Sequence, residues 1–508
     1  MKKEDLPNDV NELKKLLINS INTKNREIAL KDQQLTKKDQ RILDLEDTIQ
    51  LLRRSKFSPT SESNHRQLSF FNELEDIIDS DDEKREEKEQ ICYERKKRGK
   101  RKPIADNLPR IEKIVDLSEE EKKGLKFIGE DISEKIIVEP AKIYVFKTIK
   151  KKYAPIDNES AVITSEKGKN LLPKTMASSS LIAYIITAKY VDALPLYRQE
   201  KIFARISATL TRQTMARWLI TVSKKLMPLY NLLEEKCLDS DYLQMDETTT
   251  QVLKENGKKA TSKSYMWLRH RPGKNPIILY DYAPSRSGTV PIDLLEGFSG
   301  ALQVDGYDGY APVCEKNKLI RLGCMDHVRR KFFDAGKTSS GNNIGKKGLN
   351  LIDKLYKVEE QINMLEEDER HQARKEKSIP MLKTIKDWID ELLPKITPKS
   401  VAGKAINYAY NEWKYVERYV ENPKYHMSNI LIENAVRPFA LGRKNWLFSA
   451  SVEGAKASAM FFSIIETAKK NSFEPFDYLN KMLEQLPMAE TVDDYEKILP
   501  LKDSFQIN

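Results

Sequence analysis

The chain is poor in cysteine for its length of 508 residues, with only Cys92, Cys237, Cys314 and Cys324. So few cysteines argue against a disulfide framework and indicate a reducing compartment. No run of about 18 apolar residues is present, so no membrane span is expected. The opening residues, MKKEDLPNDVNELKK, have no apolar core after their lysines and do not resemble a secretory signal. These absences together predict a cytoplasmic protein.

Charge is what the chain has in abundance. Charged residues make up 32% of the sequence and hydrophobic residues 40%, so folded domains and solvated segments are both expected. The formal net charge is +10 at pH 7, which favours an anionic partner such as nucleic acid. The length suits roughly two to four domains, each able to bury a core of its own.

A heptad pattern marks residues 1–54. Apolar residues recur at two positions of a seven-residue repeat, Ile21, Ile28, Leu35, Ile42 and Ile49 at one and Val10, Leu17, Leu45 and Leu52 at the other. Lys24, Lys31 and Lys38 interrupt the second position. Such a seam predicts a coiled coil that is weak in its middle and through which the chain self-associates. The alternative is a lone amphipathic helix.

Composition distinguishes two further N-terminal segments. Residues 55–106 are predicted to form a charged linker, because an acidic run at Asp79–Glu89 and a basic cluster at Arg95–Lys102 keep the chain solvated. The basic cluster either binds DNA phosphates without sequence preference or belongs to a solvated tether. Residues 107–165 are predicted to form a small β-rich module, with short apolar runs on both sides of Pro140.

Residues 166–238 are predicted to form a helical region. The predicted helices are Leu181–Tyr190, Leu196–Ile206 and Thr211–Lys225, and Thr211 is a suitable N-cap for the last of them. Helices at this spacing either contact DNA, as a helix-turn-helix module does, or act as a structural connector.

From Tyr242 onward the pattern changes to strands, which indicates an α/β domain. The predicted strands are 242–246, 264–269, 276–282, 301–305 and 318–324, with helices at 290–298 and 328–335. This order predicts three meandering strands followed by strands joined to helices. The first and fourth strands can then lie side by side. Asp246 and Asp305, each at a predicted strand end, would come within reach of one ion.

The segment Ile430–Ser451, ILIENAVRPFALGRKNWLFSAS, predicts a helix that runs into a basic loop. Glu433 and Arg437 are four residues apart and share one face of that helix, whereas Pro438 is expected to break or kink it. A carboxylate beside several cations suits a metal ion next to a phosphate backbone. The alternative is an exposed helix with a surface ion pair.

The predicted basic loop contains Arg443 and Lys444. The apolar residues that follow, Trp446–Phe448, are expected to anchor this loop on a core, although an aromatic ring there can also stack on an unpaired base. Residues 336–422 are predicted to be a helical insertion that precedes the Glu433 helix. Residues 471–508 are predicted to be a C-terminal helical tail.

Five stretches, in this order, closely resemble transposases of the insertion-sequence-66 family: YLQMDETTTQVL, SKSYMWL, LQVDGYDGYAPV, GCMDHVRRKF and ENAVRPFALGRKNWLFSAS. The resemblance implies a ribonuclease-H-like mixed-sheet core, made of residues 239–335 and 423–470. It also implies a catalytic set of two Asp and one Glu, and by position these residues are Asp246, Asp305 and Glu433.

The activity that the resemblance implies is that of a DDE transposase, which cleaves transposon ends and joins the 3′-hydroxyl to target DNA. Two Mg²⁺ or Mn²⁺ ions, held by the three acids, are the implied cofactors. The implied partners are DNA, further copies of the chain on that DNA, and helper proteins of the same element in a bacterial cytoplasm. The alternatives are a catalytically silent DNA-binding regulator and a ribonuclease-H-like nuclease without strand transfer.

Two departures from the family pattern affect this expectation. Family members often carry paired cysteines, read as a zinc module, ahead of the core, but residues 107–165 contain neither Cys nor His. Zinc is therefore not expected in this module, because a tetrahedral site needs four such ligands. Before Glu433 the family usually has Asp or Ser followed by two Asn, and Ser428-Asn429-Ile430 keeps only part of this, which is expected to weaken a helix cap.

The cationic residues near the implied catalytic set are the candidates for phosphate contacts: Arg329, Arg330, Lys331, Arg437, Arg443 and Lys444. Cys324 and His327 form a Cys-x-x-His pair, in which His327 either orients the scissile phosphate of DNA or is merely packed. Two residues are too few for a zinc site. Glu247 is expected to point to the strand face opposite Asp246, and Asp308 to be a turn residue.

Overall fold

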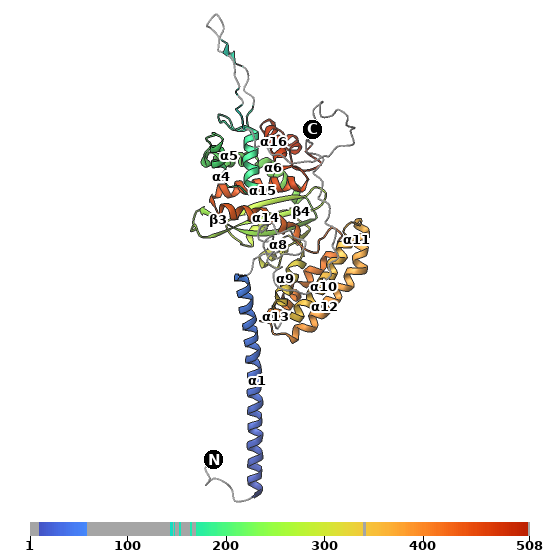
Figure 1. Cartoon of the computed structure of the whole chain (residues 1–508). Helices are drawn as coiled ribbons and strands as arrows, with labels where there is room; N and C mark the ends of the chain where they lie inside the picture. Colours follow the sequence, from blue (N-terminus) through green and yellow to red (C-terminus); the bar gives the residue numbers. More distant parts are fainter. Residues whose placement is uncertain are drawn as a thin grey trace, which may run out of the picture. The chain divides into compact units, whose positions relative to one another are not determined.

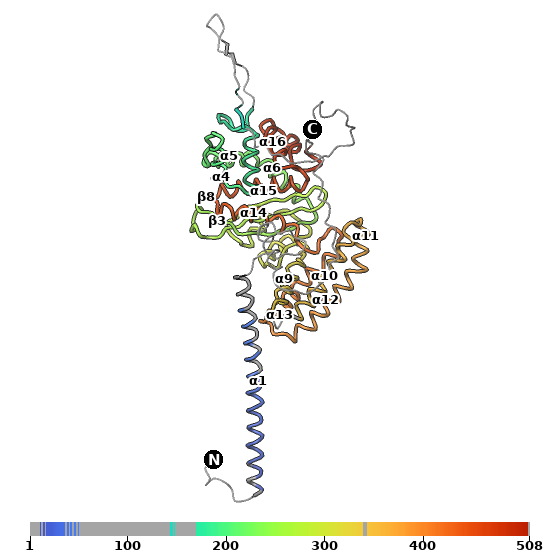
Figure 2. The backbone as a smooth tube through the Cα atoms, in the orientation of Figure 1, coloured from blue at the N-terminus to red at the C-terminus, as the bar shows by residue number. Residues whose placement is uncertain are grey.

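The computed structural model describes residues 10–57, 143–145, 147, 152–153, 163–164, 169–338 and 342–505 (Figures 1 and 2). Residues 58–106 of the predicted linker and most of the predicted β-rich module lie outside these ranges. The chain divides into two compact units, one made of Met1–Pro59 with Gly168–Asn508 and the other of Thr60–Lys167. In the second unit, β1 (Lys152–Tyr153) and β2 (Ile163–Thr164) pair antiparallel. None of the described helices is long and apolar enough to cross a membrane.

The N-terminal heptad segment forms one helix, α1 (Val10–Phe57), which ends close to the predicted bound, and residues 1–9 of the predicted segment lie outside the described ranges. The apolar seam lies open to solvent along this helix, with Ile28 56% exposed and Ile42 52% exposed. Among the seam residues whose side chains the structure describes, a single copy of the chain therefore leaves the apolar stripe largely uncovered.

The three helices predicted between residues 181 and 225 are confirmed as α3 (Ser179–Tyr190), α4 (Leu196–Arg205) and α5 (Arg212–Lys225). Thr211 caps α5 as predicted, because its hydroxyl accepts a hydrogen bond from the backbone N–H of Thr214 at 3.3 Å. The structure adds α6 (Met227–Leu238), which the sequence analysis did not identify.

The central sheet is mixed. Its strands are β3 (Tyr242–Lys254), β4 (Lys263–Arg271), β5 (Ile277–Ala283), β6 (Ala301–Gln303), β7 (Ile320–Leu322) and β8 (Ser449–Ser451). The order is β5-β4-β3-β6-β7, in which β3, β4 and β5 are antiparallel and β6 and β7 continue parallel to β3. β8 pairs parallel with the far part of β3. The predicted neighbourhood of the first and fourth strands, β3 and β6, is confirmed.

Two long helices after the sheet complete this part of the fold, α14 (Ile430–Trp446) and α15 (Val452–Lys470). α14 packs against β3 and β4, and α15 runs along β5 (Figure 1). The hydroxyls of Ser463 and Thr467 accept hydrogen bonds from the backbone N–H groups of Tyr280 and Ile278, at 2.8 and 3.0 Å. α15 thereby satisfies edge-strand groups that would otherwise be open to a foreign strand.

The predicted insertion is helical and has its own hydrophobic core. Its helices are α10 (Asn342–Ile362), α11 (Glu367–Ala373), α12 (Ile379–Leu392) and α13 (Val401–Val416), and they pack with α9 (Met325–Gly336). The remaining helices are α7 (Thr289–Leu294), α8 (Ala311–Lys316), α16 (Pro475–Gln485) and α17 (Val492–Lys497). The last two occupy the predicted C-terminal tail.

The predicted basic loop after Glu433 is wrong. The helix continues past Pro438 to Trp446 and therefore carries Arg443 and Lys444 in its last turn instead of in a loop. Burial on both sides of the proline, by Ile432 before it and Phe439 after it, holds the helix on the sheet despite the missing backbone donor.

The predicted apolar anchor is also only partly correct. Trp446 packs against the core, with its ring 6.2 Å from that of Tyr190. Leu447 is 64% exposed and Phe448 is 42% exposed. The chain turns at Leu447 into a left-handed conformation, with φ of 65°, and this turn carries both side chains away from the core.

Candidate active site

The two aspartates of the implied catalytic set follow the same four-residue pattern, Leu-Gln-x-Asp. Gln244 precedes Asp246 on β3, and Gln303, the last residue of β6, precedes Asp305. β3 and β6 are parallel, and their register places Gln244 opposite Gln303. Since side chains alternate along a strand, each glutamine and the aspartate two residues later start from the same face. The strand pairing thus brings the two aspartates to the same end of neighbouring strands.

Asp246 is not at a strand end, as the sequence analysis expected, because β3 runs on to Lys254. Its parallel pairing with β6, however, covers only Tyr242–Gln244. Asp246 therefore lies just beyond the last residue of β3 that is paired with β6, and Asp305 lies just beyond the end of β6 itself.

The side-chain amides of Gln244 and Gln303 form a buried ladder. Gln244 donates from Nε2 to Oε1 of Gln303 at 2.8 Å, and Gln303 donates from Nε2 to the backbone carbonyls of His426 and Gly323, at 2.7 and 3.0 Å. The hydroxyl of Tyr242 also donates to Oε1 of Gln303, at 2.5 Å. The ladder fastens the segment that precedes α14 to the two strands that carry the aspartates.

Glu433 lies in the first turn of α14. Asn429 occupies the N-cap position but makes no capping hydrogen bond through its side chain, as the departure from the family pattern led us to expect. Its backbone N–H lies 3.5 Å from the sulfur of Cys324, the residue just before α9. The start of α14 therefore adjoins the start of α9.

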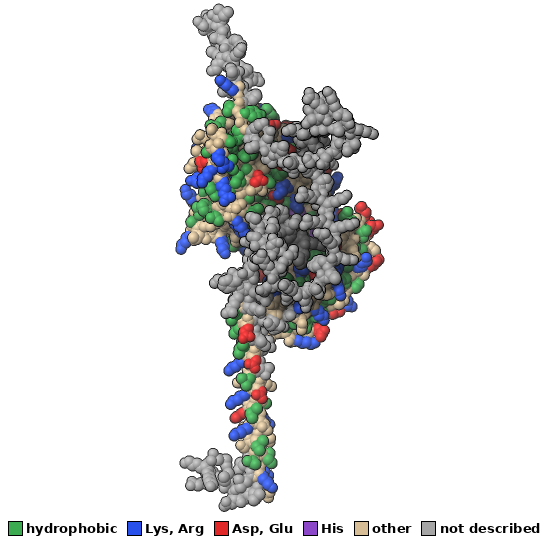
Figure 3. All heavy atoms as spheres, in the orientation of Figure 1, with side chains coloured by type: hydrophobic (Ala, Val, Ile, Leu, Met, Phe, Trp, Pro, Cys, Tyr) green, Lys and Arg blue, Asp and Glu red, His purple; other side chains and the backbone are tan. Residues whose placement is uncertain are grey.

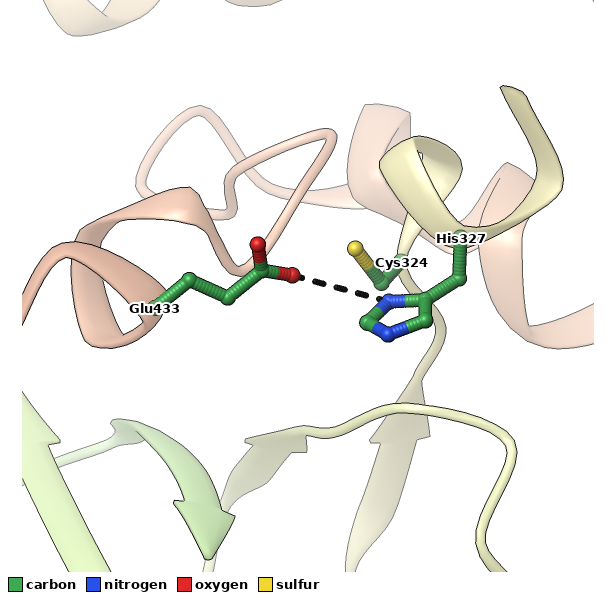
Figure 4. Close-up of side chains that lie close together, drawn as sticks. All are labelled: Cys324, His327 and Glu433. Atoms are coloured by element: carbon green, nitrogen blue, oxygen red, sulfur yellow. Dashed lines mark ion pairs between the residues drawn. The ribbon is translucent and has the colours of Figure 1, made fainter. Parts of the chain in front are cut away.

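Two basic side chains of α9 face the carboxylate of Glu433. Nδ1 of His327 lies 3.6 Å from Oε1 of Glu433, and Nη2 of Arg330 lies 3.7 Å from Oε2 (Figure 4 shows the first pair). Burial raises the pKa of Glu433, while the charges of His327 and Arg330 lower it in part. These neighbours hold the carboxylate of Glu433 against α9.

The electrostatics connect the three acidic residues. Burial raises the pKa of Asp246 to about 8, and the charges of Glu247, Asp305 and Glu433 add to the shift, which a hydrogen bond from the backbone N–H of Glu247 partly offsets. Asp246 thus lies in a region of unbalanced negative charge. A bound cation would relieve this repulsion.

The ligand atoms of the three acids indicate which metal ion they can bind. Asp246, Asp305 and Glu433 supply only carboxylate oxygens, which suit a hard ion such as Mg²⁺. Within the described part of the chain, however, the one group of three such donors whose ligand atoms lie within 4.8 Å of one another is Cys324, His327 and Glu433. The charges of Asp305 and Glu433 therefore act on Asp246 although the three carboxylates do not form a group that compact.

Glu247 points away from Asp246, as expected from strand alternation. Its carboxylate forms an ion pair with Arg286 and accepts a hydrogen bond from the hydroxyl of Tyr310 at 2.5 Å. The guanidinium of Arg286 stacks on the ring of Tyr307, 3.8 Å from its centroid, and the backbone N–H of Tyr307 donates to Asp305 at 3.0 Å. Asp308 lies in a short 3-10 turn, as predicted. Through Arg286 and Tyr307, Glu247 therefore supports the loop that carries Asp305.

The structure places the cations predicted to contact phosphate in different surroundings. On α9, Arg329 forms an ion pair with Asp353 of α10 at 3.0 Å, and Lys331 lies over the ring of Tyr408 at 5.4 Å. Of the three cations on this helix, Arg330 is the one that faces the acidic site.

On α14 the candidate cations also divide. Arg443 is turned into the fold, because it donates to the backbone carbonyl of Thr249 and to its hydroxyl, the latter at 2.8 Å. Arg437 and Lys444 are exposed on the helix surface. The charge of Arg437 acts on Glu433, so it lies on the site side of the helix.

Several residues of the site were missed by the sequence analysis, namely Gln244, Gln303, Arg286 and Tyr310. A signal for the first two was present, because LQMD and LQVD repeat one pattern at the two strands. No local signal marks Arg286 or Tyr310, since their partner Glu247 is distant in sequence.

The fold and site together define an α/β protein that gathers acidic side chains at one end of two neighbouring parallel strands. The chain belongs to the Transposase IS66 family, whose model matches residues 174–457, more than half of its length. The IS66 C-terminal element matches residues 463–501. A third model, described as Transposase C of IS166 homeodomain, matches residues 44–112, across the predicted linker.

Similar proteins occur in Sinorhizobium fredii (strain NBRC 101917 / NGR234). Uncharacterized protein y4qI is 29% identical to this chain over 486 residues, which covers 91% of this chain and 89% of the relative. Uncharacterized protein y4jD is 29% identical over 414 residues, which covers 78% of this chain and 81% of the relative. The similarity to both proteins thus extends over most of their length.

Proposed function

We propose that the protein is a DDE transposase, which cleaves the ends of its transposon and joins the 3′-hydroxyl to target DNA. The observation that carries this proposal is the parallel register of β3 and β6, which brings Asp246 and Asp305 to one end of the sheet, where the charges of Asp305 and Glu433 act on Asp246. Family membership supports a transposase in general. The order of the mixed sheet, with α14 packed against it, supports a ribonuclease-H-like core at residues 239–335 and 423–470.

Asp246, Asp305 and Glu433 would hold the divalent ions, two Mg²⁺ or Mn²⁺. When bound, such ions activate the attacking hydroxyl and stabilise the leaving oxygen of the phosphodiester. The chain's own residues set the geometry. The glutamine ladder fixes the segment before α14 relative to both strands, and Arg330 holds one oxygen of Glu433. Because the site is partly buried, it limits the access of water to the acids.

DNA is the proposed partner, and the distribution of charge supports this. Lys and Arg side chains gather on the face formed by α4 and α5 (Figure 3), where Arg205, Arg212 and Arg217 are exposed. A helical DNA-binding region at residues 166–238 would use this face on phosphates. Nearer the acids, Arg330, Arg437 and Lys444 are the proposed phosphate contacts, whereas the contacts of Arg443 assign it to the fold.

The assembly is proposed on separate grounds. The exposed apolar seam of α1 supports self-association through a coiled coil, and a second copy would cover it. We also propose that helper proteins of the same element take part in the reaction and that the protein acts in a bacterial cytoplasm. The match of residues 44–112 to a homeodomain model supports an additional DNA-binding segment there.

The decisive experiment uses DNA that carries the inverted repeats flanking the gene. With Mg²⁺ or Mn²⁺, the full-length protein should cleave these ends and join pre-cleaved ends to a target plasmid. Asp246→Asn, Asp305→Asn and Glu433→Gln should each abolish both steps while retaining end binding. Cleavage without joining would favour the nuclease, and binding without either step in the unaltered protein would favour the silent regulator.

A further inference from the structure

We propose that Cys324, His327 and Glu433 form a binding site for a borderline-soft cation, with Zn²⁺ as the natural occupant. A sulfur, an imidazole nitrogen and a carboxylate oxygen of these residues lie within 4.8 Å of one another. Figure 4 shows the three side chains converging, Cys324 and His327 from the start of α9 and Glu433 from the first turn of α14. This site is distinct in ligand chemistry from the all-carboxylate set of the proposed active site.

Hydrogen bonding leaves the nitrogen and the oxygen available to a cation, and the sulfur accepts a hydrogen bond from the backbone N–H of Asn429. Nδ1 of His327 and Oε1 of Glu433 are buried and have no hydrogen-bond partner in the described part of the chain, although they face each other at 3.6 Å. Buried polar atoms without partners are rare, and a missing ion is one physical reason for them. The second oxygen of Glu433 faces Arg330, so Oε1 is the oxygen that remains for the cation.

The ligand types select the metal. Thiolate and imidazole are ligands of Zn²⁺ and other late transition ions, whereas Mg²⁺ prefers oxygen and keeps its waters. Three protein ligands leave a fourth tetrahedral position open to water. Tetrahedral zinc, with bonds of about 2.0–2.3 Å, separates its ligands by roughly 3.3–3.8 Å, so small side-chain rotations suffice. On binding, the Cys324 thiol releases its proton to solvent and its sulfur bonds to the ion as thiolate.

The position of the site gives it a consequence for activity, and this part rests on the proposed function. Glu433 belongs to both metal sets, so an ion held by Cys324 and His327 would keep Oε1 on the α9 side. Zn²⁺ would then compete with Mg²⁺ for Glu433 and inhibit cleavage. The Cys-x-x-His pair, too small for a zinc site alone, gains its third ligand only through the fold.

Cobalt substitution of the full-length protein tests the site without any need for catalysis. Co²⁺ bound to a thiolate gives an intense near-ultraviolet charge-transfer band and visible bands that report tetrahedral geometry. We expect one equivalent of Co²⁺ to produce these bands and one equivalent of Zn²⁺ to remove them. Cys324→Ser should lose the charge-transfer band, and Cys314→Ser, which alters a free thiol outside the cluster, should keep it.

His327→Gln provides the second variant, because the His327 side chain is partly exposed, at 22%, whereas Cys324 is buried and its replacement can disturb the core. It should weaken Co²⁺ binding at least tenfold with an unchanged thermal melt. Bands that persist in both Cys324→Ser and His327→Gln, or no thiolate band in the unaltered protein, would overturn the site. Cleavage assays with increasing Zn²⁺ at fixed Mg²⁺ test the inhibition separately, so loss of the proposed transposase activity would leave the spectroscopic result intact.

Discussion

Gln244 donates a hydrogen bond from its side-chain amide to the side-chain carbonyl of Gln303 at 2.8 Å, and both side chains are fully buried. The two residues face each other across neighbouring parallel strands, each two positions before an aspartate of the proposed active site. Gln303 in turn donates hydrogen bonds from its side-chain amide to two backbone carbonyls, one of them in the segment before α14. These hydrogen bonds thus connect β3, β6 and the segment before α14, which are the parts of the chain that carry or precede Asp246, Asp305 and Glu433.

Replacing Gln303 by Leu should damage the site more than the fold. The change leaves the carbonyls of His426 and Gly323 without a donor, which costs about 1–3 kcal/mol of unfolding free energy for each buried unpaired group. With the segment before α14 released, Glu433 should be held less firmly over the aspartates. We expect a lower melting temperature and a cleavage rate reduced at least tenfold, with a higher Mg²⁺ concentration needed for half-maximal rate.

Gln251→Leu is the matched control, because Gln251 lies on β3, the strand that pairs with β6, and its amide donates to the backbone carbonyl of Ala260 at an exposed position. It should change neither the cleavage rate nor the Mg²⁺ requirement. If Gln303→Leu lowers the melting temperature but keeps the normal Mg²⁺ dependence, the ladder stabilises the fold without positioning Glu433.

Asp246→Asn should stabilise the metal-free protein in a pH-dependent way. The pKa of Asp246 is raised from 3.8 to about 8 in the fold, so the folded state binds the extra proton between these values and its stability falls as pH rises through that window. Asn removes this penalty. The gain should be absent near pH 4, grow up to pH 8 and stay constant above, with an upper limit of about 6 kcal/mol at 1.36 kcal/mol for each unit of the shift.

Thermal melts from pH 4 to pH 9 in the presence of a chelator measure this gain. Asp308→Asn, at an exposed turn position, serves as the comparison and should not reproduce the pH-dependent gain. Added Mg²⁺ should raise the melting temperature of the unaltered protein and not that of Asp246→Asn. A gain for Asp246→Asn that is the same at pH 4 and pH 9 would show that the crowding of acids is not its cause.

Arg437 and Arg443, six residues apart on α14, should respond differently to replacement by Ala. Arg443 donates to the backbone carbonyl and the hydroxyl of Thr249, so its loss should lower the unfolding free energy by about 1–3 kcal/mol. Arg437 is exposed beside the acidic site, so its loss should leave stability unchanged and weaken DNA binding several-fold. For the Arg437→Ala variant, the slope of log DNA affinity against log salt concentration should become shallower by about 1.

Melting temperatures and DNA binding at several salt concentrations separate the two effects. Lys399→Ala, a change to an exposed basic residue just before α13 and outside the proposed DNA contacts, provides a comparison for a general loss of positive charge. The assignment of Arg443 to the fold would be wrong if Arg443→Ala kept normal stability and lost DNA affinity instead.

The parts of the fold that local patterns encode were predictable from the sequence. Thr211 marks the start of α5, and the apolar runs locate β4, β5 and β6 to within a few residues. The extension of β3 was not predictable, because the residues after Asp246 are polar. Thr248 and Thr249 join the strand only because β4 pairs with them along their whole length, and β-branched side chains suit that pairing.

Only part of the candidate site could be predicted from the sequence. Predicted strand ends drew attention to Asp246 and Asp305, and neighbouring cations drew attention to Glu433, but only the resemblance to family motifs combined the three into one catalytic set. The contact between α9 and the start of α14 was out of reach, since the backbone N–H of Asn429 meets Cys324 across 105 residues of sequence. The insertion helices pack on α9, and this packing brings Asn429 back beside Cys324. Cys324 and His327 therefore gave no hint of their third neighbour.

The seam of α1 leads to the final prediction. Ile42 is 52% exposed in a single copy, and Leu45 and Ile49 extend the same apolar stripe without an interrupting lysine. If two or more copies bury this stripe, Ile42→Lys places a charge inside the interface and should shift the full-length protein to monomers in sedimentation at tens of micromolar. Gln33→Lys adds the same charge on the outer side of the helix and should leave the assembly intact.

Cleavage assays on the same two variants connect assembly with activity. Both variants keep Asp246, Asp305 and Glu433 and should keep their thermal melts. If α1 pairs the copies that act on the two transposon ends, Ile42→Lys should lose the joining of paired ends at low protein concentration and regain part of it at high concentration, because mass action then substitutes for the helix. Unaltered protein that sediments as a monomer, and joins ends as well as Ile42→Lys does, would reduce α1 to a lone amphipathic helix.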